Sequence, residues 1–111
     1  MIDDEIDYGR IMESFFNKRN YHIELAFNLT DGLQKLETFK PDILLLDNNL
    51  PEGKGWAHVE TIVEKNPHLK IFLISAYYNK EVDIQFESPN VTVFEKPLSI
   101  GLLNQHFGSL S

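Results

Sequence analysis

An uninterrupted apolar run at residues 43–46, four branched aliphatic side chains with an aspartate at each end, most constrains the fold of this chain. A run of strand length without polar interruption predicts a β-strand covered on both faces, as the strands of parallel sheets are. Two similar runs follow, and a fourth segment alternates apolar and other residues, as a strand nearer the sheet edge does. The four predicted strands are 42–47, 70–75, 91–94 and 21–27.

Between these runs the apolar residues recur with the period of a helix. This pattern predicts helices at 6–16, 29–39, 56–63 and 99–107. A weaker helix is predicted at 77–86, where β-branched and turn-forming residues dilute the helical pattern. The alternation of helix and strand indicates an α/β domain in which right-handed crossovers place a parallel sheet between helices.

Length and composition limit the classes of function. With 111 residues, 42% of them hydrophobic, the chain is predicted to form one domain. A formal net charge of −7 without any basic run argues against direct nucleic-acid binding. The absence of cysteine excludes disulfides, thiolate catalysis and cysteine metal sites. Since no apolar run approaches the roughly 18 to 20 residues of a membrane span, and the acidic start is unlike a signal peptide, we expect a cytoplasmic protein without membrane contact.

Polar residues stand where the predicted strands end. Asp47, Ser75 and Lys96 each close or follow a strand, and Asp3 and Asp4 precede the first helix, where another strand end is expected. Because the carboxyl ends of parallel strands meet at one edge of a sheet, we expect these side chains to converge. Carboxylate oxygens suit Mg²⁺, and a carboxylate can attack phosphorus to form an acyl phosphate. Asp47 is therefore a candidate nucleophile, with the metal and Lys96 neutralising charge on the transferred group.

Four motifs carry a specific resemblance. They are Asp-Asp-Glu from Asp3, Asp-Asn-Asn-Leu-Pro from Asp47 with Gly55 beyond it, Ile-Ser-Ala around Ser75, and Lys96 followed by proline. In this order and spacing they resemble the receiver domain of two-component response regulators, over nearly the whole chain. The resemblance implies a doubly wound (flavodoxin-like) parallel sheet with strand order 2-1-3-4-5.

The same resemblance implies a role for each strand-end residue. Asp47 would accept a phosphoryl group from a phosphohistidine on a sensor histidine kinase or phosphotransfer protein. Ser75 would hydrogen-bond the acyl phosphate, and Lys96 would pair with a phosphate oxygen. The output would be a change in protein–protein interactions, through a downstream partner or an output domain missing from the chain. Apart from autophosphorylation and slow self-dephosphorylation, the chain is not expected to be an enzyme.

The resemblance also implies a Mg²⁺ site. Asp4 would bind the ion directly and Asp3 mainly through water, and Asp47 would also belong to the metal site. The backbone carbonyl of Asn49 would complete the protein's share of the ligands.

The chain departs from the family pattern at its start. In the family an apolar strand of about five residues, central in the sheet, runs into the acidic pair, whereas here only Met1 and Ile2 precede Asp3. The expectation is therefore a single receiver domain, 1–111, with its first strand largely missing. Either the segment is absent, or the sheet is completed by another arrangement, including strand exchange with a second copy in a homodimer.

Two further departures concern switching. Receiver domains usually carry an aromatic residue three positions before the lysine, but Val93 stands there and Phe94 follows it. Because side chains alternate along a strand, Phe94 is predicted to lie on the opposite face from Val93. The weak helix between Tyr77 and Pro89 is hypothesised to be short or mobile and to order on phosphorylation or partner binding.

Two other functions remain open from the residues. The first is a degenerate receiver that acts only as a protein-binding module. The second is a haloacid-dehalogenase-type phosphatase, which also uses a strand-end aspartate but needs a second aspartate two residues later as general acid. Asn49 occupies that position and argues against the phosphatase.

Overall fold

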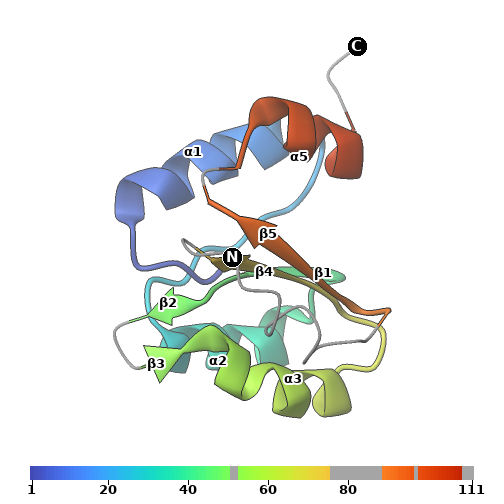
Figure 1. Cartoon of the computed structure of the whole chain (residues 1–111). Helices are drawn as coiled ribbons and strands as arrows, with labels where there is room; N and C mark the ends of the chain where they lie inside the picture. Colours follow the sequence, from blue (N-terminus) through green and yellow to red (C-terminus); the bar gives the residue numbers. More distant parts are fainter. Residues whose placement is uncertain (51–52, 76–88, 97, 109–111) are drawn as a thin grey trace.

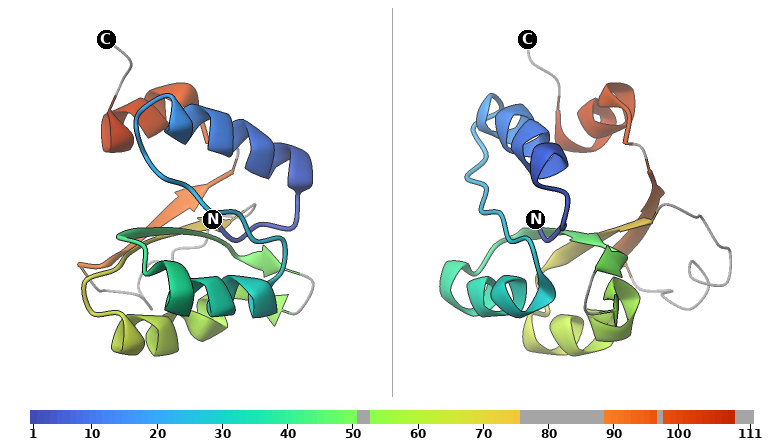
Figure 2. Two further views of the ribbon diagram at one scale, coloured as in Figure 1. Left: turned by 180° about the vertical axis from the view of Figure 1, so that it is seen from behind. Right: turned by 90° about the vertical axis from the view of Figure 1, so that its left-hand side faces the viewer.

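A parallel sheet lies between two pairs of helices in the computed structural model of the chain, which describes residues 1–50, 53–75, 89–96 and 98–108 (Figures 1 and 2). The main sheet has the strand order β1-β4-β5, and both of its pairings are parallel. Its strands are β1 (Ile43–Asp47), β4 (Lys70–Ser75) and β5 (Val91–Glu95). The three predicted apolar strands are thus confirmed, with bounds that differ by one residue at most.

Two helices cover each face of the sheet (Figure 1). On one face lie α1 (Ile6–Asn17) and α5 (Ile100–Phe107). On the other lie α2 (Leu29–Phe39) and α3 (Val59–Lys65), the latter preceded by the 3₁₀ turn η1 (Gly55–His58). The helix predicted at 56–63 therefore begins as a 3₁₀ turn, and the weak helix predicted at 77–86 lies outside the described residues.

Side-chain caps explain where two of the helices begin. The Asn28 side chain accepts a hydrogen bond from the Asp31 N–H at the start of α2, and Ser99 accepts one from Leu102 at the start of α5. Such caps satisfy N–H groups that have no partner within the helix. Lys40, in the left-handed conformation (φ 51°), ends α2.

The apolar run of β1 is continuous because both faces of the strand are covered. Leu44 and Leu46 pack into the core cluster that includes Leu36 of α2 and Ile62 of α3. Leu45 packs into a second cluster with residues of α1 and α5, including Phe15, Phe16, Leu103 and Phe107. The doubly covered strand predicted from residues 43–46 is confirmed.

The edge of the sheet near the N-terminus is reduced to single-residue pairings. Ile2 makes isolated parallel bridges to Ala26 on one side and Leu46 on the other. Ile2 thus stands between residues 21–27 and β1, where a further strand would run. The prediction of a strand over 21–27 is wrong in extent, because only Ala26 pairs. A strand is defined by pairing along its length, and within the described residues the pairing of this segment is the bridge between Ala26 and Ile2.

A short antiparallel pair, β2 (Asn49–Leu50) and β3 (Gly53–Lys54), follows β1 and was not predicted. It pairs Asn49 with Lys54 and Leu50 with Gly53 just beyond Asp47. Among the described residues, no helix combines the length and the apolarity needed to cross a bilayer.

Candidate functional site

The strand-end residues predicted from the sequence meet at one edge of the sheet. Asp47 and Ser75 are the last residues of β1 and β4, and Lys96 directly follows β5. The Lys96 N–H donates to Ser75 O (2.8 Å), which holds the lysine beside β4. Asp3 reaches the same edge because Ile2 bridges to β1 just before it.

Lys96 occupies the centre of the site. Its Nζ lies 3.2 Å from Asp3 Oδ2, 3.5 Å from Asp47 Oδ1 and 3.6 Å from Glu5 Oε1. Burial opposes the charge of the ammonium, but the three carboxylates together outweigh it, so the pKa of Lys96 lies above its ordinary value. The lysine is therefore a fixed positive charge at neutral pH, aimed at the carboxylate of Asp47.

Three carboxylates crowd the same edge. Asp3, Asp4 and Asp47 each offer an oxygen, and these oxygens all lie within 4.8 Å of one another. Asp3 and Asp47 are buried, with side chains 1% and 2% exposed, whereas Asp4 is exposed. Burial is the main cause that raises the pKa of Asp47 to about 6, and the charge of Asp3 adds to it, against a hydrogen bond from the Asn49 N–H. Burial likewise raises the pKa of Asp3.

This donor set fits a hard divalent cation. All three side chains present oxygen, the ligand that Mg²⁺ prefers, and one of them is open to the solvent from which metal-bound water comes. Asp3 Oδ2 is buried and accepts no hydrogen bond of good geometry from the described residues. This oxygen has the Lys96 ammonium 3.2 Å away as its counter-charge, and a cation would add a second one and relieve the mutual repulsion of the carboxylates.

Gly55 packs against the loop that carries the site. Its N–H donates to Asn48 O (2.9 Å). A Cβ atom at position 55 would lie 2.6 Å from the backbone oxygen of Asp47. Gly55 belongs to the motif that begins at Asp47, and this close approach explains why that position has no side chain.

Two further residues at the site were not predicted. Glu5 pairs with Lys96, and its N–H donates to Asp3 Oδ1 (2.9 Å). The ring of Tyr8 lies with its centroid 5.2 Å from Lys96 Nζ, within the range of a cation–π contact. Tyr8 lies in the first turn of α1, and no pattern in the sequence relates it to Lys96.

Phe94 of β5 lies on the face of the sheet opposite to Val93, the position at which receiver domains usually carry the aromatic residue. Phe94 is buried, stacks on Phe72 (centroids 5.2 Å apart, planes at 21°) and contacts His106 of α5. Val93 packs against the opposite cluster, with α2 and α3. The prediction that these neighbours lie on opposite faces is confirmed.

Comparison with known proteins identifies the family. The family model named response regulator receiver domain matches residues 1–107 of the chain. The chain is 34% identical over 92 residues to a protein-glutamate methylesterase/protein-glutamine glutaminase of Methanosarcina barkeri, covering 80% of this chain and 24% of that protein. It is 27% identical over 106 residues to sporulation initiation phosphotransferase F of Bacillus subtilis, covering 90% and 82%. The chain thus spans about a quarter of the length of the methylesterase and most of the length of the phosphotransferase.

Solved structures agree on the fold. A CheY-like receiver domain of Methanospirillum hungatei superposes with a TM-score of 0.84 at 21% identity, over 95% of this chain and 85% of that one. Chemotaxis protein CheY4 of Vibrio cholerae has the same TM-score at 18% identity, over 95% and 90%. At these identities the likeness bears on the fold alone. The family model's match over residues 1–107 shows that the chain belongs to the response regulator receiver domain family.

Proposed function

We propose that residues 1–111 form a single receiver domain in which Asp47 is the phosphoacceptor of a phosphorylation-operated switch. The observation that carries the proposal is the placement of the Lys96 ammonium 3.5 Å from the buried carboxylate of Asp47. A cation fixed beside a strand-end carboxylate offers positive charge where a phosphoryl group bound to Asp47 would place its oxygens.

The chemistry is an in-line phosphoryl transfer. A carboxylate oxygen of Asp47 attacks phosphorus, the P–N bond of a phosphohistidine breaks, and the imidazole nitrogen keeps the bonding pair and takes a proton from water. Asp47 must be ionised to attack, which its pKa of about 6 permits at neutral pH. Lys96 would pair with the phosphoryl oxygens and Ser75 would donate a hydrogen bond to them.

Mg²⁺ is the proposed cofactor. Asp4, Asp47 and the backbone carbonyl of Asn49 would hold it, and Asp3 would bind mainly through water. When bound, it supplies positive charge that offsets the carboxylates and the phosphoryl oxygens. The support is the cluster of carboxylate oxygens and the buried Asp3 Oδ2.

Phosphorylation is proposed to change which proteins bind the domain. Phosphoryl donors would be a sensor histidine kinase or a phosphotransfer protein, in the cytoplasm. The output would pass to a downstream protein, an attached output domain or a second copy of the chain. The likeness to a phosphotransferase of similar length supports a place in a phosphorelay. The methylesterase relatives are about four times longer than the matched region, so their named activity is not carried over to this chain.

A binding module without phosphorylation is the second candidate. The phosphorylation switch forms a covalent acyl phosphate and the binding module does not, so a measurement of protein mass distinguishes the two functions.

The protein and its Asp47→Asn variant would be incubated with acetyl phosphate and Mg²⁺ and analysed by intact-mass spectrometry. A gain of one phosphoryl group in the parent and none in the variant is expected. No gain in either protein would refute the switch and favour the binding module, and equal gains would refute the role of Asp47.

A further inference from the structure

Lys96 is attracted by three carboxylates, of which one is the proposed phosphoacceptor. Its Nζ lies 3.2 Å from Asp3 Oδ2, 3.5 Å from Asp47 Oδ1 and 3.6 Å from Glu5 Oε1. Attraction between charges depends on distance and not on direction, and the stem of a lysine is long and flexible. The ion pairs alone therefore do not direct the ammonium toward Asp47 rather than toward Asp3 and Glu5.

Tyr8 makes a contact with Lys96 in which no acid takes part. The lysine Nζ lies over the ring of Tyr8, 5.2 Å from its centroid. The face of an aromatic ring attracts an ammonium electrostatically and offers it no oxygen acceptor. The three N–H donors of the lysine thus stay available to carboxylate or phosphoryl oxygens. A ring at this place restrains the ammonium without competing with Asp47 for its hydrogen bonds.

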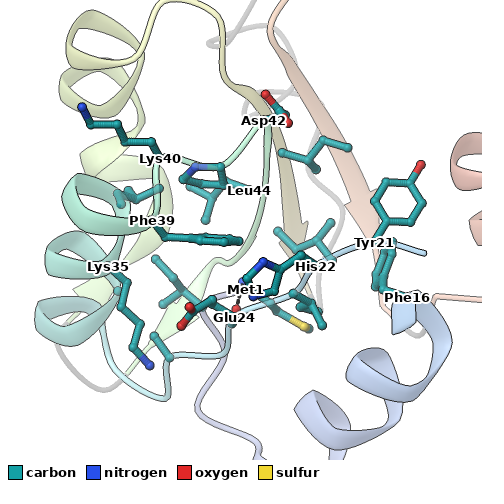
Figure 3. Close-up of a pocket in the computed structure, with 18 of the residues that line it drawn as sticks. Met1, Phe16, Tyr21, His22, Glu24, Lys35, Phe39, Lys40, Asp42 and Leu44 are labelled. Atoms are coloured by element: carbon teal, nitrogen blue, oxygen red, sulfur yellow. Dashed lines mark hydrogen bonds between the residues drawn. The ribbon is translucent and has the colours of Figure 1, made fainter. Parts of the chain in front are cut away.

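The ring of Tyr8 is held by its own packing. Tyr8 lies in the first turn of α1 and packs against the second core cluster, as Leu102 of α5 does. Two torsions position a tyrosine ring, whereas the ammonium of a lysine ends a flexible four-carbon stem. The cavity of about 400 Å³ between β1 and residues 20–24 reaches α1 at Phe16, about two turns away, and does not include Tyr8 (Figure 3). The ring is therefore the fixed member of the pair and the lysine the adjustable one.

The attraction comes from a neutral ring. Burial raises the pKa of Tyr8, while the charge of Lys96 and the nearby backbone of Leu98 act against this rise. The hydroxyl therefore keeps its proton at neutral pH and forms no ion pair with the lysine. It is buried and makes no hydrogen bond of good geometry with the described residues. The ring rather than the hydroxyl is thus the part of Tyr8 that acts on Lys96.

We propose that Tyr8 is a positioning residue for phosphoryl transfer, whose ring keeps the Lys96 ammonium directed at Asp47. The inference rests on the proposed function and adds a residue that acts through the lysine. With acetyl phosphate, an Asp47 oxygen attacks phosphorus, the bond from phosphorus to the acetyl oxygen breaks, and acetate leaves with the bonding pair. The ammonium stabilises the charge on the transferred group only where it lies beside that group. Without the ring, Lys96 is expected to turn toward the other two carboxylates.

The test follows phosphorylation by acetyl phosphate and Mg²⁺ over time, by intact-mass spectrometry. Tyr8→Leu should lower the rate about two- to fivefold, the effect of losing one cation–π contact. Tyr8→Phe keeps the ring and should react at the parent rate. Met12→Val is the control for packing, because it trims a buried side chain of the same helix and cluster, and it should also react at the parent rate. Thermal melts establish that each variant is folded.

A double-mutant cycle determines whether Tyr8 acts through the lysine. Lys96→Met keeps a long side chain but removes the charge, and in that background Tyr8→Leu should have no further effect on the slow rate. The proposal is overturned by a parent rate in Tyr8→Leu, by equal slowing in Tyr8→Phe or Met12→Val, or by the same slowing with and without the lysine. A parent protein that gains no phosphoryl group would instead refute the proposed function itself, and the role of Tyr8 with it.

Discussion

Gly55 lies so close to Asp47 that a Cβ atom added to the glycine would come within 2.6 Å of the Asp47 backbone oxygen. The same atom would lie 3.1 Å from Leu46 Cγ and 3.3 Å from Asn48 Cα. Backbone atoms at the end of β1 cannot move aside without shifting the strand, which is paired with β4 up to Asp47. The loop after β1 and the position of Asp47 are therefore tied to the absence of a side chain at residue 55.

Gly55→Ala is expected to destabilise the protein by about 2 kcal/mol, in the range of overpacking and backbone strain. It should also slow phosphorylation of Asp47, because the strand end moves. Gly101→Ala is the matched control, since only Ser99 Oγ lies within 4 Å of its added Cβ, at 4.0 Å. In α5 that change should be neutral or stabilise by up to about 1 kcal/mol. Urea denaturation measures both, and equal stability of the two variants would contradict the close approach.

The pKa of Asp47 makes a prediction about pH. Its pKa rises from 3.8 to about 6 on folding, so between these values the folded state binds more protons than the unfolded state. In metal-free protein the contribution of Asp47 to stability is therefore present below pH 4 and is lost as the pH rises through 6. Asp47→Asn removes this loss. The shift sets a limit of about 3 kcal/mol, and after allowance for solvent screening we expect a gain of about 1 to 2 kcal/mol at pH 7.

Urea denaturation in EDTA at pH 4 and pH 7 checks this expectation. The advantage of Asp47→Asn over the parent should appear at pH 7 and shrink toward pH 4. Asp42→Asn, at an exposed residue at the other end of the strand, should show no such advantage. A variant that is less stable than the parent at pH 7 would contradict the raised pKa of Asp47 and its cause, the burial of the charged carboxylate.

Binding of Mg²⁺ should stabilise the fold through the same carboxylates. At a Mg²⁺ concentration ten times the Kd, mass action gives about 1.4 kcal/mol, or roughly 5 to 10 °C in Tm for a domain of this size. Asp4→Asn should abolish the shift without unfolding the protein, because Asp4 is exposed. Asp7→Asn, an exposed acid in the first turn of α1, is the control and should keep the shift. An equal shift in all three proteins would place the ion elsewhere.

The sequence predicted those site residues that lie at the ends of strands. Asp47, Ser75 and Lys96 converge because the strands are parallel, and apolar runs identify such strands without knowledge of their neighbours. Tyr8 was missed because its contact with Lys96 depends on how α1 is rotated against the sheet. The strand over 21–27 was overestimated for a related reason: its alternating pattern is real, but a strand forms only where a neighbour pairs, and Ile2 provides one bridge. Local pattern thus predicted the elements, and pairing decided their extent.

Tyr8 is expected to tune Lys96 through its ring. The centroid lies 5.2 Å from Lys96 Nζ, and the electron-rich face of the ring favours the charged form of the lysine. Tyr8→Leu keeps an apolar side chain but removes the ring, and it should lower the pKa of Lys96 by about half a unit, since such a contact contributes about 0.5 to 1 kcal/mol. Tyr8→Phe keeps the ring and should leave this pKa unchanged. Side-chain NMR titration of Lys96 in metal-free protein distinguishes the variants. If Tyr8→Phe lowers the pKa as much as Tyr8→Leu does, the hydroxyl rather than the ring acts on the lysine, and the cation–π interpretation is wrong.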